Sequence, residues 1–212
     1  MTARPHVHVR EATPTGLPAG AYDVVMADPP WEWQARTSRG YGKSPEAHYQ
    51  TMPLDEIAAL RLGALVAPGG VMLLWATAPA LRDQLAVLDA WRLDYVTMTV
   101  WAKRTRTGKS QWGPGHISRS LCEPVLIARP RRRGRLTWRG ASFPGLVETI
   151  VADLGGDLVD GLAREHSRKP EEMYRRIEGA SPGARRADIF TRQRRPGWEP
   201  WGNQLDHFEA LT

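Results

Sequence analysis

The chain of 212 residues contains one cysteine, Cys122. One cysteine cannot form an internal disulfide or supply the thiolates of a zinc site, so no resident metal is expected. The sequence also lacks any run of roughly 18 or more apolar residues, so we expect no membrane-spanning helix. Residues 1–20 have no apolar stretch of the kind found in secretory signals. Together these absences predict a soluble protein of the cytoplasm.

Acidic residues are fewer than basic ones, with 23 Asp and Glu against 29 Lys and Arg, and the net charge is +6. This excess favours a polyanionic partner, and nucleic acid is the first candidate. Most of the excess is arginine, including the run 129–135, which is either solvated or in contact with phosphate. No G-x-G-x-x-G pattern follows a predicted strand, which argues against a nicotinamide-type dinucleotide site.

Short apolar runs alternate with amphipathic segments along the chain. The predicted strands are 22–27, 71–76, 95–101, 121–128, 150–152 and 187–190. The predicted helices begin at Pro53, cover 79–92, and cover 169–178. This alternation predicts an α/β fold of three layers with a mostly parallel sheet. We expect a single domain over residues 1–212, with 1–20 as an irregular lead-in.

Two long polar segments, 32–50 and 104–119, interrupt this pattern. Long loops inside a compact domain are usually functional or disordered. The first of them directly follows the most informative string of the chain, which is described next. We therefore expect both segments to be substrate loops.

That string is Asp28-Pro29-Pro30-Trp31, which directly follows the predicted strand 22–27. In open α/β sheets, ligands bind at the carboxyl ends of the strands. The Asp28 carboxylate can accept a hydrogen bond from an NH₂ group. The rigid Pro29 can hold its carbonyl toward the same amine, and Trp31 offers a flat face for stacking. The string therefore suggests chemistry on the exocyclic amine of a nucleobase.

From about Tyr22 to Asp206, the chain resembles the family of the catalytic subunit of mRNA adenosine N6-methyltransferase, with its bacterial and phage relatives. The string 28–31 matches the catalytic signature of that family. The other matching segments, in chain order, are 166–174, 181–183, 188–192, 196–198 and 201–206. This ordered set is far more specific than any one of its strings. One departure is the segment between Phe190 and Trp198, which is shorter than in the eukaryotic relatives.

The resemblance implies a Rossmann-like methyltransferase fold and S-adenosylmethionine as the cofactor. It places Asp28 between the methionine end of the cofactor and the target amine, with Pro29, Pro30 and Trp31 completing the catalytic string. The implied cofactor contacts are Asp28, Lys169, Asp188, Phe190, Arg192, Asn203 and Gln204. The implied substrate contacts are Tyr49, Trp101, Lys103 and Glu123.

Simpler interpretations stand beside some of these roles. Lys169 could be a solvated lysine at the start of a helix. Asn203 and Gln204 could belong to a turn, since Gly-Asn is a turn signal. Tyr49 and Trp101 could be packing residues.

The activity that the resemblance implies is methyl transfer to the N6 amine of adenine in nucleic acid. DNA is favoured over RNA, because the expected single domain carries no RNA-binding appendage. A homodimer or a partner subunit is left open. One alternative is a catalytically inactive relative that binds nucleic acid or a partner, which the intact string 28–31 disfavours. Methylation of a free nucleotide or a small metabolite amine is a third possibility, which the arginine excess disfavours.

Overall fold

The computed structural model describes residues 15–32, 51–104, 109–110, 112, 117–131, 140–150 and 169–206. In these ranges seven strands form one sheet with the order β5-β3-β4-β2-β1-β6-β7. The strands are β1 (Tyr22–Ala27), β2 (Val66–Trp75), β3 (Leu93–Arg104), β4 (Cys122–Pro130), β5 (Leu146–Ile150), β6 (Arg186–Ile189) and β7 (Trp198–Trp201). The helices are α2 (Leu54–Ala59), α3 (Leu81–Ala90), α5 (Glu171–Ala180) and the short 3₁₀ helices η2 (Leu62–Leu65) and η3 (Ala78–Ala80).

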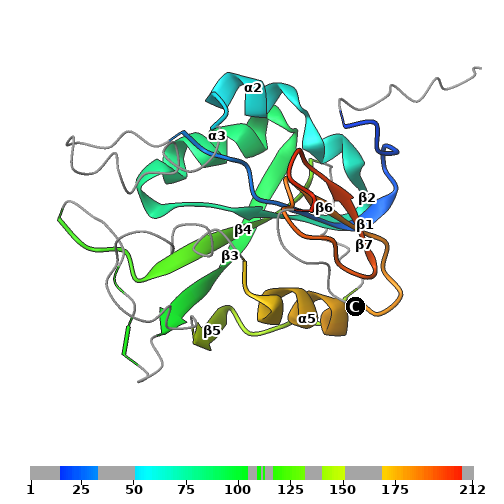
Figure 1. The fold of residues 1–212 in the computed structure, drawn as a ribbon. Helices are drawn as coiled ribbons and strands as arrows, with labels where there is room; N and C mark the ends of the chain where they lie inside the picture. Colours follow the sequence, from blue (N-terminus) through cyan, green and yellow to red (C-terminus); the bar gives the residue numbers. More distant parts are fainter. Residues whose placement is uncertain are drawn as a thin grey trace, which may run out of the picture.

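The sheet is the middle of three layers. Helices α2 and α3 lie on one face and α5 lies on the other (Figure 1). Strand β1 pairs in parallel with β2 and β6, β6 with β7, and β3 with β5. Strand β4 is antiparallel to both of its neighbours, β2 and β3. The predicted three-layer α/β fold with a mostly parallel sheet is confirmed.

Strand β1 lies inside the sheet, between β2 and β6, and its side chains are apolar toward both faces. Val25 belongs to the cluster that includes Leu88 of α3. Val24 belongs to the opposite cluster, with Met173 of α5. A strand covered on both faces reads as a continuous apolar run, which is why the sequence located this strand well.

Strand β2 begins earlier than predicted, at Val66 instead of Val71. The prediction placed a turn at Ala67–Gly70, but this segment continues the strand. Gly70 makes that possible, because a Cβ there would lie 2.7 Å from the Asp23 carbonyl of β1. The pairing of β1 with β2 shifts register between Tyr22 and Val24, opposite this segment of β2.

Strand β7 was not predicted, because its sequence, Trp-Glu-Pro-Trp, lies among turn-forming residues. Pro200 is tolerated because β7 is the edge strand of the sheet and has no partner beyond it in the described ranges. Within those same ranges, no helix has both the length and the apolar character needed to cross a membrane.

A pair of glycine substitutions tests the packing of the layers. We expect Gly63→Ala to be strongly destabilising, because its Cβ would lie 2.1 Å from the Trp91 carbonyl oxygen. Overpacking of this kind costs about 1–3 kcal/mol or more. The matched control is Gly179→Ala in α5, where an added Cβ meets nothing within 4 Å. That change should leave stability equal or raise it by up to about 1 kcal/mol. Urea unfolding measures the free energy of unfolding of both variants. Equal values for the two would contradict the close packing of Gly63 against the Trp91 backbone.

Candidate active site

Three segments far apart in the sequence meet at the carboxyl end of β1. Asp28 directly follows β1, and its backbone N–H donates to the Ile189 carbonyl at the end of β6 (3.1 Å). Glu123 lies at the start of β4, which is antiparallel to β2 and β3 and so begins where these two neighbours end. Lys169 precedes Pro170, the N-cap of α5. The fold therefore brings two carboxylates and one ammonium group to the same edge of the sheet.

The Lys169 ammonium group lies between these two carboxylates. Its Nζ is 3.1 Å from Asp28 Oδ2 and 3.3 Å from Glu123 Oε2. The side chain of Lys169 is 15% exposed and that of Asp28 is 30% exposed, so the group is accessible from one side only. The same Nζ lies 4.9 Å from the centre of the Trp75 ring, which adds a cation–π contact.

The pKa of Asp28 is raised above its ordinary value. Removal of the carboxylate from bulk water is the largest cause, and the negative charge of Glu123 acts in the same direction. The positive charges of Lys169 and Arg192 oppose the shift. These two cations therefore favour the ionised form of Asp28.

Hydrogen bonds fix the string that follows Asp28. The Trp31 backbone N–H donates to the Pro29 carbonyl (2.8 Å), which closes a three-residue turn. The Trp31 indole N–H donates to the Trp75 carbonyl (3.1 Å), and the Met52 N–H donates to the Pro30 carbonyl (2.9 Å). The Pro29 carbonyl thus has one partner already, and a carbonyl oxygen has a second lone pair for another donor. Contact of Pro29 with a substrate amine stays a prediction.

A second, largely buried polar cluster supports this edge of the sheet. Asp188 Oδ2, at β6, accepts hydrogen bonds from the Tyr174 hydroxyl (3.1 Å) and from Arg195 Nη1 (3.3 Å). Arg195 also donates to Glu171 Oε1 at the start of α5 (2.9 Å). Burial raises the pKa of Asp188 to about 6, although Arg195 opposes the shift. This cluster joins the segment after β6 to the start of α5, next to Lys169.

The closing segment of the chain lies against the turn that follows β6. Phe190 has a left-handed backbone (φ 63°), and its ring packs edge-on against Trp201 at 5.2 Å. Gly202 allows this approach, because a Cβ there would lie 2.7 Å from the Thr191 carbonyl. Asn203 and Gln204 follow directly, so the fold brings them to the carboxyl end of β7 beside β6.

The predicted site residues divide into three groups. The structure brings Asp28, Lys169 and Glu123 into direct contact, with the charge of Arg192 acting on Asp28. Asp188 and Trp101 are buried, at 3% and 4% exposed, so their side chains lie within the protein beneath this edge. Tyr49 and the Lys103 side chain fall outside the described residues, as do most of the two predicted substrate loops. The roles of all these residues toward cofactor and substrate stay predictions.

Trp101 illustrates why a buried residue still affects the site. Its ring packs edge-on against Trp75 at 5.9 Å, and Trp75 in turn carries the Lys169 ammonium group on its ring. On β3, Trp101 is the register partner of Glu123. Trp101 therefore supports the two residues that hold Lys169.

Nothing local in the sequence indicates the roles of Trp75, Tyr174 and Arg195. Trp75 ends an apolar run, and such a run signals burial without showing what the ring faces. Arg195 stands among other arginines in the sequence, and nothing local distinguishes it as buried. Its charge partners, Asp188 and Glu171, come from two other segments, so only the assembled fold reveals the cluster.

The donors and acceptors at this edge fit S-adenosylmethionine. Lys169 and Arg192 supply positive charge for a carboxylate, and Asp28 supplies negative charge for an ammonium or sulfonium group. The close approach of Gly202 to Thr191 places Asn203 and Gln204, two amide side chains, at the same edge, where they could bond a ribose diol.

The contact between Lys169 and Asp28 predicts how a substitution of Lys169 changes the pKa of Asp28. We expect Lys169→Met to raise the pKa of Asp28 further, because the ammonium group that favours the carboxylate is lost. Carboxyl carbon NMR, assigned with Asp28→Asn, measures this pKa. Arg176→Met is the control, because Arg176 pairs with Glu172 on the same helix and should leave Asp28 unchanged. An unchanged or lower pKa of Asp28 in Lys169→Met would show that the two groups do not interact.

Comparisons with known proteins find similar sequences over most of the chain. The family model MT-A70 matches residues 22–204. The chain is 32% identical over 195 residues to the N(6)-adenosine-methyltransferase MT-A70-like protein of Drosophila melanogaster, covering 88% of the chain and 27% of that protein. It is 29% identical over 200 residues to the N(6)-adenosine-methyltransferase catalytic subunit METTL3 of Homo sapiens, covering 91% of the chain and 30% of that protein.

A third relative is closer in length. The chain is 25% identical over 206 residues to the type II methyltransferase M.MunI of a Mycoplasma species, covering 89% of the chain and 80% of that protein. The chain thus spans less than a third of the two N(6)-adenosine-methyltransferases. The methyl donor of MT-A70 methyltransferases is S-adenosylmethionine. Because the family model covers nearly the whole length from β1 to the segment after β7, the resemblance inferred from the sequence is confirmed, and the chain belongs to the MT-A70 family.

Proposed function

We propose that this protein transfers a methyl group from S-adenosylmethionine to the N6 amine of adenine in nucleic acid, with DNA favoured over RNA. The observation that carries the proposal is the placement of Asp28. Its carboxylate lies at the carboxyl end of β1 inside the family's catalytic string, 3.1 Å from the Lys169 ammonium group.

The reaction requires the protein to activate a weak nucleophile. The exocyclic amine of adenine is a poor nucleophile because its lone pair is delocalised into the ring. Asp28 would accept a hydrogen bond from one amine hydrogen, and the free lone pair of the Pro29 carbonyl would accept the other. Both bonds draw the nitrogen toward tetrahedral geometry and localise its lone pair. S-adenosylmethionine supplies an electrophilic methyl group when bound.

Ionised Asp28 would also receive the proton that the methylated nitrogen loses. Its pKa is raised above the ordinary range, which makes it a better proton acceptor than a fully solvated aspartate. Lys169 would have two tasks, because its ammonium group keeps Asp28 ionised and can hold the cofactor carboxylate. The proposal assigns the cofactor ribose to Asn203 and Gln204, with Phe190 and Asp188 behind them.

Two observations support nucleic acid, and DNA in particular. The net charge of +6 favours a polyanion. The relatives include a bacterial DNA methyltransferase, M.MunI, which matches 89% of the chain. The target base must be unpaired or flipped out of its duplex, and Trp31 and Tyr49 are the proposed stacking partners.

The human relative's description as a catalytic subunit supports assembly with a second copy or a partner subunit.

Methyl transfer can be measured directly. We expect purified protein with radiolabelled S-adenosylmethionine to label adenine in oligonucleotides, and to label DNA faster than RNA. Substrates should include single- and double-stranded forms, with free adenosine and nucleotides as competitors. Label on RNA alone would overturn the DNA preference, and label on free nucleotides alone would overturn the nucleic-acid substrate. No label anywhere, together with no cofactor binding by calorimetry, would refute the proposal as a whole.

A substitution at Asp28 separates catalysis from binding. Asp28→Asn should lower kcat by at least about 10²-fold, which is the scale for losing one preorganised charged contact at a reacting centre. The matched control is Asp23→Asn at the opposite end of β1, where the carboxylate accepts a hydrogen bond from the Arg185 N–H (3.0 Å). This control should keep its activity. Full activity in Asp28→Asn would mean that Asp28 does not touch the amine, and an inactive wild type that binds both ligands would support the alternative of an inactive relative.

A further inference from the structure

Trp112 is unusual among the tryptophans of this protein. Its residue is 59% exposed, and in the described part of the chain it is the only exposed tryptophan. The Arg119 guanidinium lies over its ring, 5.3 Å from the centre. A single exposed aromatic ring is common on protein surfaces, so a role for Trp112 is inferred from its cation contact and from its place in the chain.

Trp112 belongs to the connection between β3 and β4, which leaves the sheet at the same edge as the active site. Strand β3 ends at Arg104 and β4 begins at Cys122. Next to that end, Trp101 of β3 pairs with Glu123 of β4, and Glu123 contacts the Lys169 that contacts Asp28. The connection is therefore anchored on the residues that form the site.

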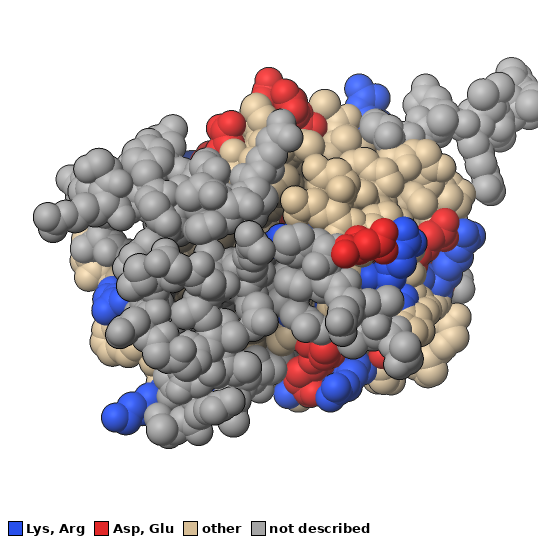
Figure 2. Space-filling model, in the orientation of Figure 1, with Lys and Arg blue, Asp and Glu red and all other residues tan. Residues whose placement is uncertain are grey.

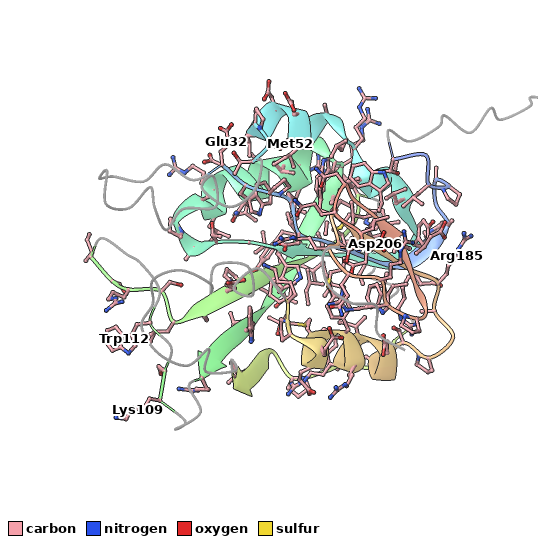
Figure 3. The ribbon with its side chains drawn as sticks, in the orientation of Figure 1. Glu32, Met52, Lys109, Trp112, Arg185 and Asp206 are labelled. Carbon is pink, nitrogen blue, oxygen red and sulfur yellow. The ribbon has the colours of Figure 1, made fainter. Side chains whose placement is uncertain are left out.

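The base of this connection is ordered by a further contact. Arg104 forms an isolated antiparallel bridge with Ser110, and its Nη1 donates to the Ser110 hydroxyl (2.8 Å). We call Arg104, Lys109, Ser110, Trp112 and Arg119 the β3–β4 arm. Figure 3 shows Lys109 and Trp112 on the side of the molecule opposite Arg185.

The charge on this side suits a phosphate backbone. Lys109, Arg104 and Arg119 are the charged residues of the arm. Figure 2 shows basic side chains at the lower left of the view, where Figure 3 labels Lys109, while acidic side chains lie at the top, over the helical layer of α2. An exposed aromatic ring among cations is the combination that single-stranded nucleic acid recognises, through base stacking and phosphate contact.

We propose that Trp112 stacks on an unpaired base of the substrate strand that flanks the target adenine, while Arg119 and Lys109 contact its phosphates. This inference rests on the proposed function, and it assigns to that function a second nucleotide-binding position beyond the catalytic pocket. Stacking needs only a π-face, so the position would tolerate any base. Arg119 orients the ring by covering one of its faces, which favours stacking of the base on the other.

The test measures binding of a fluorescein-labelled single-stranded DNA containing one adenine. Trp112→Ala should weaken binding by about 5- to 150-fold, the range that base–aromatic stacking covers. Trp112→Phe should retain most of the affinity, because a smaller aromatic ring still stacks. Tyr95→Ala is the matched control, since Tyr95 is an exposed aromatic (44%) near the start of β3, away from the arm. Calorimetry with S-adenosylmethionine should give the same affinity for all four proteins.

A second set of oligonucleotides identifies the stacked base. In each of them an abasic site replaces one nucleotide next to the adenine. Wild type should lose affinity at one of these positions, and Trp112→Ala should lose nothing further there, because the two changes remove the same contact. Arg119→Gln should reduce the dependence of binding on salt concentration, as expected when a phosphate contact is lost.

The outcomes separate this inference from the proposed function. A wild type that methylates adenine while Trp112→Ala binds DNA equally well would refute the stacking role and leave the methyltransferase proposal intact. Binding that depends on Trp112 without any methyl transfer would support the arm and refute the proposed activity. A wild type that neither binds nor labels any oligonucleotide would refute both.

Discussion

The contact between the Lys169 ammonium group and two carboxylates is the interaction on which this site depends. It joins Asp28 after β1, Glu123 on β4 and the start of α5, three segments that share no sequence neighbourhood. Burial and the charge of Glu123 raise the pKa of Asp28, and the positive charges of Lys169 and Arg192 oppose that rise. Lys169 is the cation in direct contact with both carboxylates, so it favours their ionised forms.

The buried cluster around Arg195 explains how Lys169 is held in place. Arg195 connects Asp188 of β6 to Glu171 of α5, and its guanidinium lies 3.8 Å from the centre of the Tyr174 ring. Breaking a buried ion pair by removing one partner leaves an uncompensated charge, which is far more costly than losing a surface pair. The start of α5 is thus fixed from behind, while the face that carries Lys169 stays accessible. Arg195 lies in the segment between Phe190 and Trp198, which is shorter than in the eukaryotic relatives. This segment therefore helps to hold α5 in place, in addition to any contact with cofactor.

The sequence predicted most of the fold and named the residues that meet at the site, and the limits of that prediction have physical causes. Strand β1 was located correctly because burial on both faces leaves an uninterrupted apolar run. Strand β7 was missed because an edge strand tolerates Pro200, which reads as a loop residue. The contact of Asp28 with Lys169 could be anticipated only as shared proximity to a cofactor, because the fold decides which residues meet when they are this far apart in the sequence. The roles of Trp75 and Arg195 could not be predicted from the neighbouring sequence, because the residues that contact these side chains come from other segments.

The order of the strands has a consequence for how the molecule comes to be made. Strand β1 is the first strand in the described residues, yet one of its two neighbours, β6, follows much later, and Asp23 bonds to Arg185 across 162 positions. A growing chain on the ribosome therefore carries an apolar strand with one open edge until β6 has been made. Non-local pairing of this kind is slow and leaves such edges exposed to aggregation. The residues around Asp28 therefore come together only after β6 has been made and has paired with β1.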